Sequence, residues 1–370
     1  MKEEMIVTLT IKSVALFPVS VPLKEPFKTA LRTVTTAETT LIVVTDSDGM
    51  TGLGEAAPTA AITGDTQGSI KTAIETAIAP KIVGLPLTAP GRVKHAIETA
   101  IVGNHSPKAG VNIAVNDLLA KHYGVSVARY LGGFRSAFET DYTVSVGSEA
   151  EMVNHAARLV KQGFKTLKIK VGTLAPEADR QHVAAIRSAV GPAIGLRLDA
   201  NQGWHPKAAA RAINEMTDAG LNLELVEQPV PAADFSGMAY VTQHTEVPIM
   251  ADESIFSPAD ALRLLNMGGC DIINLKLMKA GGLDNALTIN TIAESFGIPC
   301  MVGSMIESQV SVTAAAHLVA AKQNVAYVDL DAAMMFQSQP AQGGIMNEGN
   351  VITVPDAPGL GLKYEPNQVR

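Results

Sequence analysis

The chain has 370 residues, of which 47% are hydrophobic and 18% are charged, a composition typical of a folded globular protein with a substantial core. The net charge of −7 argues against nucleic acid or an anionic membrane surface as the main partner. The two cysteines, Cys270 and Cys300, form neither a disulfide framework nor a zinc motif. With no signal-peptide pattern and no apolar run of the ~20 residues that a membrane span needs, we expect a cytoplasmic protein.

Residues 1–135 are predicted to form a small α+β domain. A strand-like segment covers Thr8–Val21, and Thr39–Thr45 and Met50–Glu55 are predicted to pair as a hairpin around Asp46-Ser-Asp-Gly49. Helical periodicity follows, interrupted by prolines, over three segments: Ser69–Ala79, Pro90–Val102 and Ala109–His122.

From Phe138 onward the pattern changes to alternating strands and alanine-rich amphipathic helices. Eight strand-like segments are present: Thr140–Val146, Thr166–Val171, Ile194–Asp199, Leu223–Glu227, Pro248–Ala251, Asp271–Lys276, Pro299–Gly303 and Val325–Leu330. Their number and spacing predict a (β/α)₈-type (TIM-like) barrel over residues 136–336, followed by a C-terminal return over residues 337–370 that packs on the capping domain. A doubly wound open sheet is the alternative, but the glycine-rich nucleotide-binding turn it requires is missing from the sequence.

The second predicted barrel strand, Thr166-Leu-Lys-Ile-Lys-Val171, carries two lysines on one face, because side chains alternate along a strand. Taken alone, Lys168 and Lys170 are typical of an edge strand that exposes lysines to water. The later strands change this interpretation, since almost all of them end in a charged residue. The C-terminal ends of barrel strands form the face on which such enzymes place their active sites.

Three consecutive strands lead into carboxylates: Asp199 in Leu-Asp-Ala-Asn-Gln, Glu227 in Val-Glu-Gln-Pro, and Asp252 in Met-Ala-Asp-Glu-Ser. A single carboxylate after a strand is more often a helix cap or a surface charge. Three of them converging at one side of a barrel mouth repel one another, so a cation among them is expected. All-oxygen ligation favours Mg²⁺.

The ring geometry of an eight-stranded barrel places the remaining charges around this metal site. Strands two and six lie opposite each other, so Lys170 and Lys276 are expected to face each other across the mouth. Strand eight lies opposite strand four, so Asp329 and Asp331 are expected to face the metal. A substrate lying across the site would have an anionic end on the metal, a cationic end at the aspartates, and a lysine on either side of the carbon between them. This arrangement favours removal of a proton from one face of that carbon and its return to the other.

Abstraction of a proton next to a carboxylate requires a cation on the carboxylate oxygens and a base that is neutral near pH 7. We expect Lys168 to lower the pKa of Lys170 through the proximity of its like charge.

At these residues the chain resembles the enolase superfamily, and within it the muconate-lactonizing-enzyme subgroup. The resemblance extends over the whole chain and rests on five motifs: Lys168-Ile-Lys170, Asp199-Ala-Asn201, Val226-Glu227-Gln-Pro, Asp252-Glu253-Ser, and Lys276 before Lys279-Ala-Gly-Gly282. Asp329-Leu-Asp331 is similar to the Asp-x-Asp motif with which dipeptide epimerases, in particular the L-Ala-D/L-Glu epimerases, bind the α-ammonium of the substrate.

The resemblance implies a Mg²⁺-dependent dipeptide epimerase of peptidoglycan turnover that acts by two-base 1,1-proton transfer through a metal-stabilised enediolate. Lys170 and Lys276 would be the acid/base groups, and Lys168 would help to hold the substrate carboxylate. Pro26-Phe-Lys-Thr-Ala-Leu-Arg32 and Ile62-Thr-Gly-Asp65 resemble capping loops, in the first of which Arg32 would pair with a glutamate side chain. A homo-oligomer is implied, with neither nucleic acid nor membrane as a partner.

Alternative functions use the same site with another substrate: an N-acylamino acid racemase, an o-succinylbenzoate synthase or a muconate cycloisomerase. Their ligands carry no free ammonium group, which would leave Asp329 and Asp331 without a role. A non-catalytic barrel that binds a dipeptide is a further alternative. The sequence leaves open the preferred second side chain, the role of Glu307, and that of the segment Met334-Met335-Phe336, which is predicted to form an apolar wall.

Overall fold

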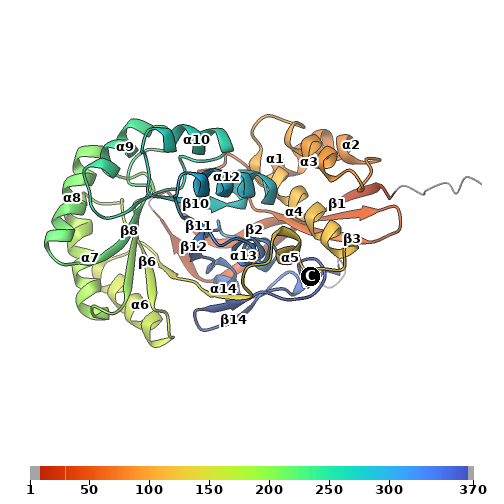
Figure 1. Ribbon diagram of the computed structural model, residues 1–370. Helices are drawn as coiled ribbons and strands as arrows, with labels where there is room; N and C mark the ends of the chain where they lie inside the picture. Colours follow the sequence, from red (N-terminus) through yellow and green to blue (C-terminus); the bar gives the residue numbers. More distant parts are fainter. Residues whose placement is uncertain (1–8, 30, 366–370) are drawn as a thin grey trace, which may run out of the picture.

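The computed structural model describes residues 9–29 and 31–365, and they form an N-terminal β-rich part, a nearly closed parallel barrel and a short C-terminal segment (Figure 1). The N-terminal sheet has the order β1-β2-β3, formed by Ile11–Lys28, Thr33–Asp46 and Thr51–Ala56. The predicted hairpin is therefore confirmed, although β1 and β2 are longer than predicted. Both strands extend past the sheet core toward the capping loops.

The N-terminal helices cover one face of this sheet. α1 (Gln67–Ala73) continues through a π-helical turn, η1 (Ile74–Ile78), into α2 (Ala79–Ile82), and α3 (Pro90–Glu98) and α4 (His105–His122) follow. α4 is buried along most of its length and packs directly on β3. This approach depends on glycine, since a Cβ on Gly54 would lie 2.0 Å from the carbonyl oxygen of Gly110 in α4.

Eight parallel strands form the barrel in the order β5 to β12, as the strand pattern predicted. The backbone N–H of Asp141 donates to the carbonyl of Val328 at 3.3 Å, which brings the first and last strands together. The observed bounds differ from the predicted ones by at most two residues: β5 Tyr142–Val144, β6 Thr166–Lys170, β7 Gly195–Asp199, β8 Leu223–Glu227, β9 Ile249–Ala251, β10 Ile272–Lys276, β11 Cys300–Gly303 and β12 Val325–Asp329.

Helices pack around the outside of the barrel, and several begin at residues that cap them. Ser148 and Glu151 form a capping box at the start of α6, and Ser257 caps α10, which has a proline in its first turn. The longer helices are α6 Glu149–Lys161, α7 Pro176–Val190, α8 Pro206–Asp218, α9 Phe235–Gln243, α10 Pro258–Asn266, α12 Leu283–Ser295 and α13 Gln309–Ala321. The short ones are α5 Val127–Leu131, α11 Leu277–Ala280 and α14 Ala332–Met335.

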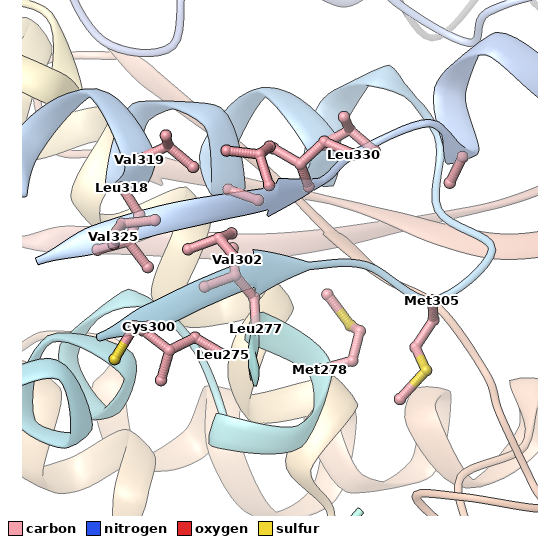
Figure 2. Close-up of a cluster of buried hydrophobic side chains, with 14 of the residues drawn as sticks. Leu275, Leu277, Met278, Cys300, Val302, Met305, Leu318, Val319, Val325 and Leu330 are labelled. Carbon is pink, nitrogen blue, oxygen red and sulfur yellow. The ribbon is translucent and has the colours of Figure 1, made fainter. Parts of the chain in front are cut away.

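The main core lies between the barrel strands and these helices. Figure 2 shows part of it, where Leu275 of β10, Val302 of β11 and Val325 of β12 belong to one buried cluster with Leu318 and Val319 of α13. These aliphatic residues are almost fully buried, and burial on this scale contributes about 1.5–3 kcal/mol for each large side chain. The barrel is thereby a rigid support for the residues at its strand ends.

The C-terminal segment returns to earlier parts of the chain. β15 (Val351–Thr353) pairs with β14 (Met346–Glu348) and with β4 (Ala137–Glu139), and β13 (Gln342–Gly343) pairs with β16 (Leu362–Lys363). Gly359 exchanges backbone hydrogen bonds with Val125 and Val127, next to α5. Among the described residues, no helix combines the length and the apolar character needed to cross a membrane.

Candidate active site

Strand register brings the predicted site residues to one level at the C-terminal end of the barrel. Lys170 on β6 is the register partner of Asp199 on β7, which in turn is the partner of Glu227 on β8. On the other side, Lys276 of β10 and Asp329 of β12 are both partners of Gly303 on β11. Parallel strands that end at the same level present their last side chains to a common space.

A single cavity at this end of the barrel is lined by every residue that was predicted to act in catalysis or to bind substrate: Arg32, Lys168, Lys170, Lys276, Asp329 and Asp331. The other lining residues are mainly apolar, and most come from the capping loops and from the segments after β11 and β12, among them Phe27, Ile62, Met305 and Met335. The barrel strands therefore supply the lysines and aspartates of the cavity, whereas the capping loops supply apolar residues and Arg32.

Lys168 is not exposed at a sheet edge, since β6 lies between β5 and β7 and the lysine is only 2% exposed. Its ammonium group lies 2.7 Å from Asp329 Oδ2, 2.7 Å from Glu227 Oε2 and 3.1 Å from Asp199 Oδ2. Burial disfavours its charge, but these carboxylates outweigh burial and hold the pKa of Lys168 well above its usual range. Lys168 is therefore a fixed positive charge beside Lys170.

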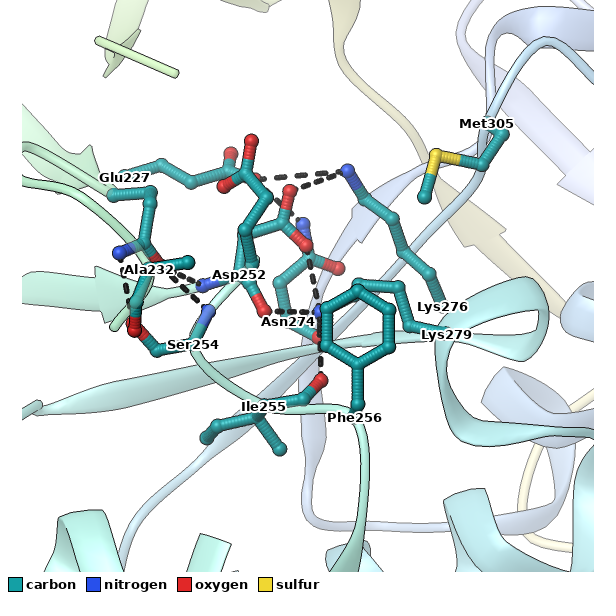
Figure 3. A network of polar contacts seen from close by, with 12 residues as sticks. Glu227, Ala232, Asp252, Ser254, Ile255, Phe256, Asn274, Lys276, Lys279 and Met305 are labelled. Carbon is teal, nitrogen blue, oxygen red and sulfur yellow. Dashed lines mark hydrogen bonds and ion pairs between the residues drawn. The ribbon is translucent and has the colours of Figure 1, made fainter. Parts of the chain in front are cut away.

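Lys170 and Lys276 each pair with a different predicted metal ligand. Lys170 Nζ donates to Asp199 Oδ2 at 2.5 Å. Lys276 Nζ donates to Asp252 Oδ2 at 2.6 Å, and Figure 3 shows this second pair. Lys276 also lies 4.0 Å from Glu227 Oε1. Both lysines are almost buried, at 6% and 5% exposure, and both line the cavity. Two amines from opposite sides of the barrel thus reach the same space.

The three carboxylates predicted to bind a metal are fully buried. Burial opposes their ionisation, but Lys170 and Lys168 lower the pKa of Asp199 to about 2, and Lys276 and Lys279 lower that of Asp252 further. Burial and the charge of Asp199 raise the pKa of Glu227 to about 7. The three carboxylates therefore differ in how readily they carry a negative charge, and Glu227 carries it least readily.

These carboxylates also fit a hard cation. In residues 9–29 and 31–365, no three acidic, cysteine or histidine side chains are gathered closely enough to enclose an ion, and ammonium groups lie among these carboxylates. The donor set is nevertheless all oxygen, and nearby Glu253 Oε2 and Asn201 Oδ1 are buried without a hydrogen-bond partner. A hard cation or its water ligands would satisfy these buried oxygen atoms, which no protein group does.

Two residues that were not assigned a role hold these carboxylates in place. Lys279 is fully buried, pairs with Asp252 Oδ1 at 2.7 Å, and donates to the carbonyls of Asp252, Ile255 and Asn274 (Figure 3). Asn274 Nδ2 donates to Glu227 Oε1 at 2.8 Å. The period of two along β10 was a usable signal for Asn274, since it places Asn274 on the same face as Lys276.

The two aspartates after β12 have different environments. Asp329 pairs with Lys168, whereas Asp331 Oδ2 accepts the backbone N–H of Thr143 at 2.7 Å. Burial and the charge of Asp329 raise the pKa of Asp331 to about 7. A cationic group beside the pair would favour ionisation of both carboxylates.

The structure also places the remaining residues that the sequence analysis singled out. Arg32 is half-buried and lines the cavity together with Leu31 and Ile306, as its predicted contact with substrate requires. Met335 contributes to the apolar wall as predicted, whereas Glu307 is buried outside the cavity lining. His317 is a buried residue of α13, as expected for a packed helix residue.

The comparison with known proteins agrees with this geometry. Residues 11–132 match the mandelate racemase/muconate lactonizing enzyme N-terminal domain, and residues 151–368 match the enolase C-terminal domain-like family. The chain belongs to the mandelate racemase/muconate lactonizing enzyme family. The superfamily predicted from the lysine and carboxylate motifs is therefore confirmed.

Within this family, the chain is 48% identical to the L-Ala-D/L-Glu epimerase of Bacillus subtilis over 93% of this chain and 94% of that protein. It is 40% identical to the hydrophobic dipeptide epimerase of Enterococcus faecalis over 96% of this chain and 100% of that protein. The substrate-liganded structure of the B. subtilis enzyme superposes with a TM-score of 0.95, covering 96% of this chain and 99% of that one. The E. faecalis structure in complex with Mg and L-Leu-L-Tyr superposes with a TM-score of 0.92, covering 96% and 100%.

These family members confirm the predicted barrel fold and the predicted type of enzyme, an epimerase that belongs to the isomerases. The Mg in the E. faecalis complex agrees with the predicted cofactor. The roles of individual residues, including the three metal ligands, remain predictions supported by the contacts described above.

Proposed function

We propose that the protein is a Mg²⁺-dependent dipeptide epimerase that acts on L-Ala-D/L-Glu, or on related L-Ala-L-Xaa dipeptides, by 1,1-proton transfer. The observation that carries this proposal is that Lys170 and Lys276, from opposite sides of the barrel, line one cavity above three buried carboxylates. The B. subtilis enzyme, which is similar over nearly the whole chain, supports the same substrate.

Asp199, Glu227 and Asp252 are the residues that would hold Mg²⁺. When bound, the cation would stabilise the negative charge that develops on the substrate carboxylate as the α-proton leaves. Lys168 lies against two of these carboxylates and would add a second positive charge for the same carboxylate. Asn274 and Lys279 would keep Glu227 and Asp252 in position.

The proton transfer requires one neutral and one charged lysine. Starting from one epimer, the neutral amine removes the α-proton and becomes an ammonium group, while the other ammonium group delivers its proton to the opposite face of the same carbon. The product is the other epimer, and the two lysines have exchanged protonation states. Either direction uses the same two groups with their roles reversed.

The ends of the substrate are distinguished by charge. Asp329 and Asp331 would bind the free α-ammonium group, since both carboxylates line the cavity. Arg32, which lines the same cavity, would bind the side-chain carboxylate of a C-terminal glutamate through its guanidinium group. The aspartate pair disfavours N-acylated substrates, whose nitrogen carries no charge.

The direct test is incubation of the Mg²⁺-loaded protein with L-Ala-L-Glu in deuterated water. We expect one α-hydrogen of the glutamyl residue to exchange while L-Ala-D-Glu accumulates, and chelation of the metal to stop both processes. Failure of every member of a dipeptide library to exchange this hydrogen would contradict the proposal.

We further infer a cytoplasmic role in peptidoglycan turnover and a homo-oligomeric assembly. Cys270 and Cys300 are both free and buried, which supports a reducing compartment. Sedimentation of the purified protein measures its oligomeric state.

A further inference from the structure

Glu55, in β3 of the N-terminal sheet, is a fully buried carboxylate that the proposed chemistry does not use. Its oxygens accept hydrogen bonds mainly from the barrel. Oε1 accepts from the backbone N–H of Ser308 at 2.8 Å, and Oε2 accepts from the Ser308 hydroxyl at 2.6 Å and from the backbone N–H of Ser311 at 2.8 Å. The fourth donor is the hydroxyl of Thr39 on neighbouring β2, at 2.8 Å.

These contacts cap α13, which follows barrel strand β11. Ser308 is the N-cap residue of this helix, and its own hydroxyl accepts from Val310 N at 3.2 Å. The side chain of an N-cap residue often accepts the N–H of the residue three positions later, which is Ser311 in α13. Here Glu55 of the N-terminal sheet accepts this N–H instead. A carboxylate at this place also interacts favourably with the positive end of the helix.

The same contacts control a wall of the active site. Ser304, Met305 and Ile306 line the cavity, and only Glu307 separates them from Ser308. Glu307 folds back, so that its carboxylate accepts Met305 N at 2.6 Å and the hydroxyl of Ser311. Ser311 therefore joins the two carboxylates, with its N–H on Glu55 and its hydroxyl on Glu307. Glu55 is thus linked, through Ser308 and Ser311, to the segment that contains Ser304–Ile306.

We propose that Glu55 is a positioning residue for the active site, which fixes the wall Ser304–Ile306 against the second residue of the substrate by capping α13 from the N-terminal domain. This inference rests on the proposed epimerase function. It makes the shape of the substrate pocket depend on the docking of the N-terminal sheet against the barrel. Arg32 and Ile62, which come from that same part of the chain, line the cavity beside Ile306.

The test compares Glu55→Gln with a matched change elsewhere. The amide of Gln would turn its N–H groups toward the backbone N–H of either Ser308 or Ser311, so that one buried donor loses its acceptor. We expect KM for the dipeptide to rise about tenfold or more while kcat changes less than about threefold, because the lysines lie on strands that Glu55 does not contact. The milder Ser308→Ala, which keeps the backbone contact, should raise KM in the same direction but less.

Asp46→Asn is the control, since Asp46 is a buried carboxylate that accepts Asp48 N at 3.0 Å and Met50 N at 2.9 Å in the turn after β2 and does not line the cavity. It should lower stability and leave KM unchanged. Hydrogen exchange of the peptide spanning residues 304–311 gives a second measurement, and we expect faster exchange in Glu55→Gln than in Asp46→Asn.

The inference would be overturned if Glu55→Gln left both KM and the hydrogen exchange of residues 304–311 unchanged. If Glu55→Gln does not fold, the same result in Ser308→Ala would overturn it. Failure of the proposed function is distinguishable, because the unmodified protein would then exchange no α-hydrogen on Ala-Glu. In that case, KM is measured with a library dipeptide whose α-hydrogen the protein does exchange. If the protein acts on no dipeptide, the backbone hydrogen exchange of residues 304–311 decides the test.

Discussion

At the scale of single residues, the site is a set of buried charges that compensate one another. Lys168 contacts three carboxylates, Lys170 pairs with Asp199, and Lys276 pairs with Asp252. Each charge avoids the cost of isolation in the protein interior only because its partner is present. A substitution in this set therefore removes a chemical group and also leaves a neighbouring charge unpaired, so its effect on turnover must be measured together with its effect on binding.

The first prediction concerns the acid/base pair. Lys276→Ala should lower interconversion of the epimers by about 10³-fold, since general acid–base groups contribute on this scale. Mg²⁺ binding, measured by calorimetry, should persist, because the three carboxylates proposed to bind the metal remain. Lys207→Ala, a change at an exposed position of α8, is the control and should retain full turnover. Normal turnover in Lys276→Ala would remove this residue from the mechanism.

A second prediction concerns recognition of the ammonium group. Asp331→Asn keeps an oxygen to accept the N–H of Thr143 but removes the negative charge. We expect kcat/KM for a free dipeptide to fall about 10- to 100-fold, since hydrogen bonds to charged groups are worth about 1.5–3 kcal/mol. For an N-acetylated substrate, which has no ammonium group, kcat/KM should fall little. An equal fall in kcat/KM for both substrates would assign Asp331 a structural role instead.

At the scale of secondary structure elements, the N-terminal part depends on the close packing of β3 on α4. Gly52 and Gly54 of β3 face the helix, and a Cβ on either one would lie 2.0 Å from a carbonyl oxygen of α4. This packing positions β3, and with it Glu55 and the following capping loop that contains Ile62.

Gly54→Ala should therefore destabilise the protein by about 1–3 kcal/mol, because α4 has to move to make room for the methyl group. Denaturant unfolding measures the change. Gly68→Ala is the matched control, since nothing lies within 4 Å of a Cβ at this exposed position of α1 and alanine favours a helix there. Equal stability of the two variants would contradict the packing argument.

At the scale of the whole molecule, buried polar groups join segments far apart in the sequence. His317 of α13 accepts the N–H of Ala128 in α5 at its Nδ1 atom, at 2.9 Å, and its Nε2 atom lies 3.4 Å from the carbonyl of Leu360 in the C-terminal segment. The first contact requires an unprotonated Nδ1 atom. Burial lowers the pKa of His317 to about 4.

This histidine predicts a loss of stability in mild acid. Because its pKa falls from about 6.5 in the unfolded chain to about 4 in the folded protein, the unfolded state binds the proton first. The contribution of His317 to the free energy of unfolding is complete above pH 6.5 and decreases as the pH falls toward 4. The total decrease is about 3 kcal/mol.

Unfolding free energies measured between pH 7 and pH 4 should show this loss, and His317→Asn should reduce the slope by about one proton. His205→Asn, at the exposed start of α8, is the control. An unaltered slope in His317→Asn would assign the acid sensitivity to other groups.

Much of the architecture was predictable because hydrophobic periodicity is a local property. All eight barrel strands were located within two residues, since each contains a short apolar run and most lead into a charged residue at or just after the end of the strand. The length of β1 and β2 was underestimated, because both strands extend over exposed residues whose pattern carries no clear alternation. The supporting roles of Lys279 and Glu55 were missed, because each depends on a partner brought close only by folding.

The sequence by itself determined the repeating strand–helix pattern, the kinds of charged groups at the strand ends, and their positions around the barrel. Only the tertiary structure decided which lysine pairs with which carboxylate, and that Arg32 reaches the same cavity as Lys276. The physical reason is that periodicity is set by neighbours along the chain, whereas ion pairs and cavity walls are set by distances in space between residues that are far apart in the sequence.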